Sequence, residues 1–239
     1  MAESESRFPP STRPDRSHSI LAGIVLELTV LAVVAVACQD HEAGRVPPPS
    51  GSPSRREAPT IVFLGTSLTA GLGLDPYQAY PAIIQRRLDA EGLEARVINA
   101  GVSGETSAGA LRRLDWLLQQ ATAVLVVETG ANDGLRAQDP DATRANLQAI
   151  IERARRATPP PKLLVLGMEA PPNFGAEYAR RFRAIYRDVA RDKNVPLVPF
   201  VLAGVAGDPL LNQPDGIHPT AAGQEIIAAT VWKALRPLL

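Results

Sequence analysis

The chain has 239 residues, of which 45% are hydrophobic and 21% charged, and its formal net charge is zero. This length accommodates one folded domain with extensions, and the balanced charge lacks the basic surplus of a nucleic-acid-binding protein. A single cysteine excludes an intramolecular disulfide framework and a cysteine-clustered zinc site, and three histidines leave little material for another metal site. We therefore expect neither a metal nor another cofactor.

Residues 1–37 have the pattern of a signal peptide. A polar segment precedes an apolar stretch from Ile20 to Ala37, and Cys38 follows the small-residue site Ala35-Val36-Ala37. Bacterial lipoproteins carry their lipidated cysteine at such a position. We predict a lipid on Cys38, export to the cell envelope or periplasm, and attachment to a membrane through this anchor.

Two alternatives for this segment stay open. They are ordinary cleavage before Cys38, without a lipid, and an uncleaved N-terminal membrane anchor. Glu27 lies inside the apolar stretch and disfavours a permanent span, because an ionised group near the bilayer centre costs about 2.5 kcal/mol or more.

Residues 38–59 are rich in proline and serine and include Pro47-Pro48-Pro49. They show no apolar periodicity, so they lack the means to bury a core. We interpret them as a flexible linker between the anchor and a domain that spans residues 60–239.

Residues 60–239 alternate between strand-like and helix-like segments. Short apolar runs predict strands that are buried on both faces, and longer segments with apolar residues three or four positions apart predict helices. The predicted strands are Thr60–Leu64, Arg96–Asn99, Ala123–Thr129, Lys162–Met168 and Leu197–Phe200. The predicted helices are Tyr80–Leu93, Ala108–Leu118, Pro140 to about Ala157 with Asp139 as N-cap, Tyr178–Val189, and a last helix opened by Pro219. The alternation predicts an α/β fold, a three-layer α/β/α sandwich around a five-stranded parallel sheet.

Four polar clusters lie next to these elements. Three follow predicted strands and one precedes the last helix: Gly65-Thr66-Ser67-Leu68, Gly101-Val102-Ser103-Gly104, Gly130-Ala131-Asn132-Asp133 and Asp215-Gly216-Ile217-His218. Because ligands bind at the carboxyl ends of parallel strands, we expect all four clusters on one rim of the sheet.

The clusters contain the groups that acyl transfer by a serine needs. Ser67 offers a hydroxyl nucleophile, and His218 is the one histidine of residues 60–239 that could act as its base. Asp215 lies three residues before His218, close enough for its carboxylate to orient the imidazole ring. Each residue alone is equally consistent with a turn or a helix cap, and only their joint placement on one rim favours catalysis.

Two further groups complete such a site. The backbone N–H of Gly104 and the side-chain amide of Asn132, together with the N–H of Ser67, are suited to stabilise an oxyanion. Gly104 is equally consistent with a turn glycine, and Asn132 with an asparagine that caps the loop.

In order and spacing, the four clusters resemble the blocks of the SGNH (GDSL-type) hydrolases, most closely the periplasmic thioesterase I, lysophospholipase L1 and arylesterase group. The resemblance covers roughly Thr60 to Leu239 and implies a flavodoxin-like fold. It implies a catalytic triad of Ser67, Asp215 and His218 and an oxyanion hole of Ser67, Gly104 and Asn132. One departure is Thr66, which stands where the family usually has aspartate.

The activity implied is hydrolysis of a carboxylic ester or thioester through an acyl-serine intermediate, without a metal. Substrates of the acyl-ester, aryl-ester, acyl-CoA or lysophospholipid type are consistent with it, and residues 134–138 and 170–174 are candidates for the acyl pocket. We expect a monomer that binds a small-molecule or lipid acyl ester. Two alternatives are an esterase that removes acyl or acetyl groups from envelope glycans and a non-catalytic acyl-binding lipoprotein. The complete set of Ser, Asn, Asp and His disfavours the second alternative.

Overall fold

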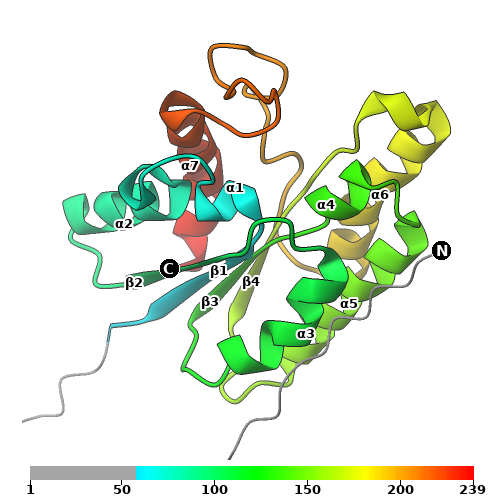
Figure 1. Cartoon of the computed structure of the whole chain (residues 1–239). Helices are drawn as coiled ribbons and strands as arrows, with labels where there is room; N and C mark the ends of the chain where they lie inside the picture. The colour runs from blue at the N-terminus through cyan, green and yellow to red at the C-terminus, as the bar shows by residue number, and fades with distance from the viewer. Residues whose placement is uncertain (1–57) are drawn as a thin grey trace, which may run out of the picture. The chain divides into compact units, whose positions relative to one another are not determined.

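The computed structural model describes residues 58–239 (Figure 1). The predicted signal peptide of residues 1–37, the lipidation at Cys38 and all but the last two residues of the predicted linker lie outside the described residues. Within residues 58–239, no helix combines the length and the apolar character needed to cross a membrane.

The centre of the domain is a five-stranded sheet in the order β2-β1-β3-β4-β5, and every neighbouring pair is parallel. Its strands are β1 (Thr60–Gly65), β2 (Arg96–Gly101), β3 (Val124–Glu128), β4 (Lys162–Leu166) and β5 (Leu197–Val198). All residues of β1 and β3 are buried, as their unbroken apolar runs predict for strands covered on both faces. At the edge of the sheet, β2 is partly exposed throughout.

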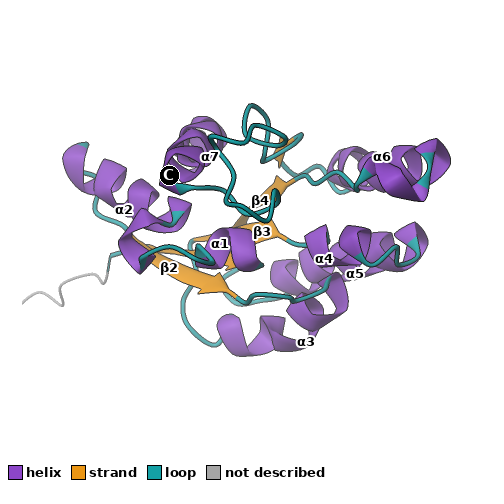
Figure 2. Cartoon of the chain, turned by 45° about the horizontal axis from the view of Figure 1, so that its top comes forward, coloured by secondary structure: helices purple, strands orange, loops and turns teal. Residues whose placement is uncertain are grey.

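Helices cover both faces of the sheet (Figure 2). On one face α2 (Tyr80–Ala90) packs against α7 (Ala221–Leu235), and on the other α5 (Pro140–Arg155) packs against both α3 (Ser107–Leu117) and α6 (Ala176–Asp192). Shorter helical segments are α1 (Ser67–Ala70), α4 (Ala131–Leu135), η1 (Pro76–Gln78), η2 (Pro172–Phe174) and η3 (Arg236–Leu238). The predicted three-layer α/β/α sandwich is confirmed.

Aromatic side chains fill the two layers between helices and sheet. The rings of Phe63 and Tyr80 lie edge to face with centroids 5.5 Å apart, and those of Phe182 and Tyr186 do the same at 5.9 Å. All four side chains are buried. The Phe63–Tyr80 pair packs α2 against β1, and the hydroxyl of Tyr186 in α6 donates to the carbonyl of Thr129, directly after β3, at 2.8 Å.

Some boundaries differ from the predictions for local reasons. The helix expected to reach Leu93 ends at Ala90, since Gly92 adopts a positive φ of 66° that stops the helix. The last strand is only Leu197–Val198. By contrast, Asp139 caps α5 as predicted, because its side chain accepts a hydrogen bond from the N–H of Asp141.

The start of the last helix is also different. Pro219 was predicted to open it but instead pairs with Asn212 in an isolated antiparallel bridge. Thr220 is the N-cap of α7, and its hydroxyl accepts from the N–H of Gly223. The bridge keeps Pro219 outside the helix and holds the preceding His218 in a loop rather than in the first helical turn.

Candidate active site

All four polar clusters lie where strands end, or in the loop that follows the last strand (Figure 1). Ser67 is the first residue of α1, two positions after β1 ends, and Gly104 lies in the loop between β2 and α3. Asn132 lies in α4, after β3, and His218 lies in the loop between β5 and α7. The parallel sheet brings these segments together because its strands all end at the same edge.

A chain of hydrogen bonds joins a serine, a histidine and an aspartate. The Oγ atom of Ser67 is 2.9 Å from Nε2 of His218, and Nδ1 of His218 is 2.6 Å from Oδ2 of Asp215. Ser67 is buried and the His218 side chain is mostly so, whereas 45% of the Asp215 side chain is exposed. The structure thus brings together the three residues predicted for catalysis, in the order that proton transfer from the serine requires.

The Asp215 carboxylate is stabilised as an anion. Its Oδ1 atom accepts hydrogen bonds from the backbone N–H groups of Ile217 and His218, each at 3.0 Å. The N–H of His218, its imidazole and the N–H of Ile217 lower the pKa of Asp215 from 3.8 to about 2. Because this pKa is depressed, Asp215 stays ionised until the pH falls toward 2.

Gln213 holds the His218 loop against α1. Its N–H donates to the carbonyl of His218 at 2.7 Å, and its side-chain amide donates to the carbonyls of Pro219 and Leu72 at 2.9 and 2.7 Å. Leu72 follows α1, the helix that begins with Ser67. The sequence analysis missed Gln213, because its partner Leu72 is 141 residues away along the chain.

The predicted oxyanion donors occupy adjoining segments. The amide of Asn132 donates to the carbonyl of Glu105 at 3.0 Å, which leaves its second hydrogen available. Gly104 is exposed with a φ of 77°, and its carbonyl accepts from both terminal nitrogens of Arg136 at 3.1 Å. Thus α4 and the residue after it hold the Gly104 loop from two sides, through Asn132 and Arg136.

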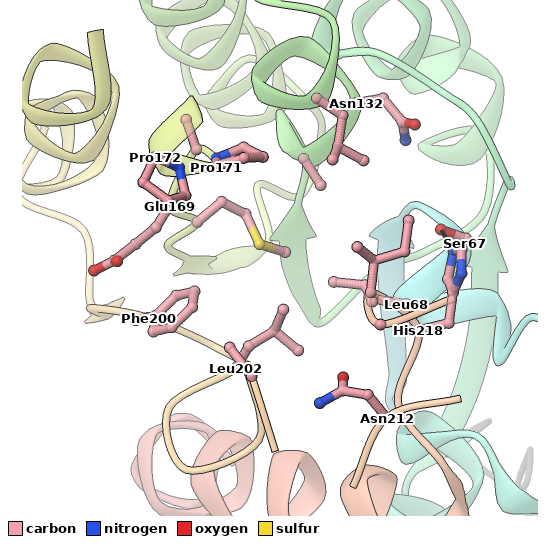
Figure 3. Close-up of a pocket in the computed structure, with 18 residues that line it drawn as sticks. Ser67, Leu68, Asn132, Glu169, Pro171, Pro172, Phe200, Leu202, Asn212 and His218 are labelled. Atoms are coloured by element: carbon pink, nitrogen blue, oxygen red, sulfur yellow. Dashed lines mark hydrogen bonds between the residues drawn. The ribbon is translucent and has the colours of Figure 1, made fainter. Parts of the chain in front are cut away.

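A cavity of about 510 Å³ opens beside Ser67 and His218 (Figure 3). Asn132 and Leu68 also line it, whereas Gly104 does not. In the view of Figure 3, Glu169 and Phe200 lie at the end opposite Ser67. The other lining residues are mostly apolar: Ala131, Leu135, Met168, Ala170, Pro171, Pro172, Leu202, Ala206, Gly207, Asn212, Gly216 and Ile217. The two segments predicted for the acyl pocket therefore contribute Leu135 and residues 170–172.

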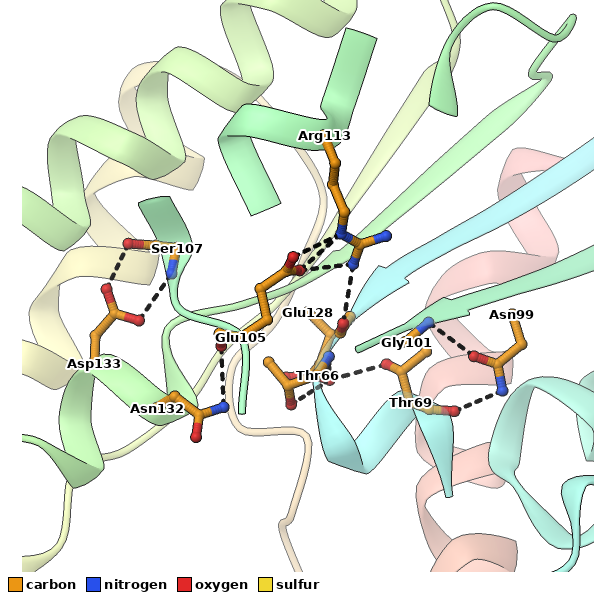
Figure 4. Close-up of polar contacts among 11 residues, drawn as sticks. Thr66, Thr69, Asn99, Gly101, Glu105, Ser107, Arg113, Glu128, Asn132 and Asp133 are labelled. Carbon is orange, nitrogen blue, oxygen red and sulfur yellow. Dashed lines mark hydrogen bonds and ion pairs between the residues drawn. The ribbon is translucent and has the colours of Figure 1, made fainter. Parts of the chain in front are cut away.

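Thr66, the departure from the family pattern, contacts a buried acid that the sequence analysis missed (Figure 4). Its N–H donates to Oε2 of Glu128 at 2.8 Å, and its hydroxyl lies 3.0 Å from both carboxylate oxygens. Glu128 ends β3 and is fully buried. Nothing in the apolar pattern of β3 marks this residue, because its partners come from the turn after β1.

Within residues 58–239, no group of three or more histidine, cysteine, aspartate or glutamate side chains is arranged to hold a metal ion. The polar groups at the rim are instead a hydroxyl, an imidazole, a carboxylate and an amide. A parallel α/β/α sandwich that carries a hydrogen-bonded serine, histidine and aspartate at its strand ends defines a hydrolase of the serine type.

Comparison with known proteins identifies the family. Residues 63–226 match the model of the GDSL-like Lipase/Acylhydrolase family, and the chain belongs to this family. It is therefore a hydrolase of esters and thioesters, which confirms the class of enzyme that the four clusters predict.

Relatives and solved structures agree. The chain is 44% identical to Esterase TesA of Pseudomonas aeruginosa over 76% of this chain and 90% of that protein. It is 37% identical to Thioesterase 1/protease 1/lysophospholipase L1 of Escherichia coli, over 76% of this chain and 86% of that protein. The crystal structure of TesA superposes with a TM-score of 0.72 at 44% identity, covering 75% of this chain and 99% of that one. The SGNH-hydrolase family esterase AlinE4 does so with a TM-score of 0.63 at 41% identity, covering 77% and 97%.

Proposed function

We propose that Ser67, His218 and Asp215 form the catalytic triad of this hydrolase. Ser67 attacks the carbonyl carbon of an ester or thioester while His218 takes its proton and then returns it to the leaving group. Water, activated by the same imidazole, releases the acid from the acyl-serine. The observation that carries this proposal is the continuous hydrogen-bonded line from Ser67 through His218 to Asp215.

We further propose that the N–H groups of Ser67 and Gly104 and the amide of Asn132 stabilise the negative oxygen of the tetrahedral intermediate. The second amide hydrogen of Asn132 supports this role, as does the place of Asn132 beside Ser67 in the cavity wall. The left-handed backbone of Gly104 supports it too, because a glycine there lets the loop approach the reacting carbonyl closely.

The cavity supports an acyl ester or thioester as the substrate. Its lining is mostly apolar beyond the Ser67–His218 pair, as the binding of an acyl chain or an aromatic ring requires. Substrates of the aryl-ester, acyl-CoA or lysophospholipid type all place such a group next to a scissile carbonyl. Since Ser67, His218 and Asp215 come from one chain, the proposed site needs no second copy, which supports action as a monomer.

Hydrolysis of p-nitrophenyl esters of increasing acyl length tests this proposal. We expect turnover by the wild-type chain, and a loss of about 10²–10³ in kcat for Asn132→Ala because one oxyanion donor is removed. The KM should change little, since the amide acts on the intermediate rather than on the ground state. Equal kcat values for Asn132→Ala and wild type would contradict the assignment of Asn132.

We also propose that the hydrolase domain of residues 60–239 is exported and tethered to the cell envelope through a lipid on Cys38. The small-residue site before Cys38 and the proline- and serine-rich segment after it support this proposal.

Changing Cys38→Ser tests the tether. We expect the wild-type protein in the membrane fraction with a lipid mass on its N-terminal cysteine, and the variant without that mass and outside the membrane fraction. Because Cys38 is the only cysteine of the chain, thiol chemistry elsewhere cannot produce the same result. A wild-type protein whose mature mass includes no lipid would refute the proposal.

A further inference from the structure

Glu128 is a buried acid whose hydrogen bonds converge on the segment that carries Ser67 (Figure 4). Its carboxylate accepts from the N–H of Thr66 at 2.8 Å, from the hydroxyl of Thr66 at 3.0 Å and from the hydroxyl of Thr69 at 2.9 Å. Thr66 precedes Ser67 directly, and Thr69 lies in the same short helix α1. One carboxylate at the end of β3 therefore binds the residue before Ser67 and a residue shortly after it.

No cation of the described residues balances this carboxylate by direct contact. The guanidinium of Arg113, which lies beside the same turn, pairs with Glu105 at 2.7 Å and donates to the carbonyl of Gly65 at 3.2 Å. Glu128 has no solvent-exposed surface. A buried carboxylate held only by hydroxyl and amide donors is costly, and a core hydrophobic residue would avoid that cost.

The space around Glu128 is closed as well. A Cβ atom placed on Gly65 would lie 1.9 Å from the Thr69 hydroxyl and 2.9 Å from Oε2 of Glu128. The Thr69 hydroxyl also lies 2.6 Å from the hydroxyl of Tyr80, which is buried in α2. The segment from Gly65 to Thr69 therefore has little freedom to move as long as the carboxylate accepts its donors.

We propose that Glu128 is a positioning residue for the reaction: its carboxylate holds the Gly65-Thr66-Ser67 turn so that the hydroxyl and the N–H of Ser67 point correctly. This inference rests on the proposed role of Ser67 as nucleophile. Glu128 makes no hydrogen bond to Ser67 and does not line the cavity, so it acts through Thr66 and Thr69.

Thr66 suits this arrangement better than the family's usual aspartate. A second carboxylate at this position would lie about as close to Glu128 as the Thr66 hydroxyl does, and two carboxylates so near one another cannot both ionise readily. The Thr66 hydroxyl instead donates a hydrogen bond to Glu128 when the acid is ionised, and it can accept a hydrogen bond from the carboxyl group when the acid is neutral. Thr66 thus stays hydrogen-bonded to Glu128 in both charge states, but protonation reverses the direction of this bond and weakens the carboxyl group as an acceptor for the Thr66 N–H and the Thr69 hydroxyl.

The carboxyl group of Glu128 changes its charge near neutral pH. Burial raises its pKa from 4.5 to about 7, while the hydrogen bonds from Thr66 and Thr69 oppose the increase. The charged or titratable groups that face it are Tyr80 on α2, Tyr186 on α6 and the Arg113–Glu105 pair beside the turn. Burial and the charge of Glu128 keep the pKa of Tyr80 well above 10, so this tyrosine keeps its proton near pH 7.

The test is the pH dependence of kcat and KM on a p-nitrophenyl ester, measured with the full chain and with two variants, Glu128→Gln and Thr66→Val. Gln keeps the volume but presents an NH2 group to the donors. We expect kcat of Glu128→Gln to fall about 10–100-fold, because a small displacement of the nucleophile lowers the rate by about this much. KM should stay within about twofold of the wild-type value.

Thr122→Val is the control, because Thr122 precedes the other end of β3 and its hydroxyl donates only to the carbonyl of Gln120. Its kcat should match that of wild type.

The acid limb of the profile distinguishes positioning from a merely structural role. The acid limb of wild-type kcat/KM should include an ionisation that belongs to Glu128, because protonation weakens the carboxylate as an acceptor for the turn that carries Ser67. In Glu128→Gln this ionisation should be absent. In Thr66→Val it should move to higher pH, because the anion loses a donor.

A Glu128→Gln enzyme with wild-type kcat and an unchanged acid limb would overturn the inference. The same holds if Glu128→Gln lowers the unfolding temperature but leaves kcat and the pH profile unchanged, because the role would then be structural only. If Glu128→Gln fails to fold, the shift expected for Thr66→Val decides alone. Failure of the proposed function is seen separately, as activity retained by Ser67→Ala.

Discussion

Replacing Ser67 with alanine is expected to lower kcat on a p-nitrophenyl ester by about 10⁴-fold or more, because removal of the nucleophile leaves only the oxyanion donors and substrate binding. KM should stay near the wild-type value, since the cavity beyond Ser67 is intact. Steady-state kinetics with the purified full-length chain measures both constants. The unfolding temperature of the variant should be close to that of wild type, since the alanine removes only one hydroxyl.

Ser103→Ala is the matched control for this variant. Ser103 is exposed in the loop after β2, on the same rim, and is not joined to His218. We expect its kcat within about threefold of wild type. If Ser67→Ala kept wild-type activity, Ser67 would not be the nucleophile.

Replacing His218 with alanine is expected to have the second largest effect, a loss of about 10⁴-fold or more in kcat. The Ser67 hydroxyl would lose the acceptor that lies 2.9 Å away, and no other imidazole of the described residues could take its proton. Asp215 would keep its charge but would have no ring to orient.

The double variant Ser67→Ala/His218→Ala tests whether the two residues act together in one step. Residues that act as one unit are not additive, so the double variant should be about as active as either single variant. Losses that multiply to about 10⁸ would mean that the two residues act in separate steps, which would contradict the triad.

Much of the fold follows from patterns that any parallel α/β domain must have. Strands buried on both faces need unbroken apolar runs such as Ile61–Leu64 and Val124–Val127, and helices on a sheet need an apolar stripe. The order of these segments along the chain then leaves few topologies, because crossovers between parallel strands are right-handed. These constraints are local or topological, and a single sequence carries them.

Short elements escaped prediction for an equally physical reason. The helices α1 and α4 have four and five residues, too few to display a helical period. Pro219 is predicted to begin a helix because proline is favoured at the first helical position, but its bridge to Asn212 overrides that preference. In both cases tertiary contacts rather than local propensity decide the backbone.

The sequence already points to Ser67, Asn132, Asp215 and His218, the residues that we propose for the site, since a serine hydrolase needs these chemical groups and the strand ends place them on one rim. Their alignment depends on contacts that no local pattern encodes. Gln213 reaches Leu72 from the far end of the chain, and Glu128 receives its donors from Thr66 across the sheet. The burial that raises the pKa of Glu128 exists only when β1 and β3 lie side by side under their helices. The sequence thus specifies which polar groups are present and at which edge of the sheet they lie. The tertiary structure decides the distances between these groups and the charge that a buried one such as Glu128 carries.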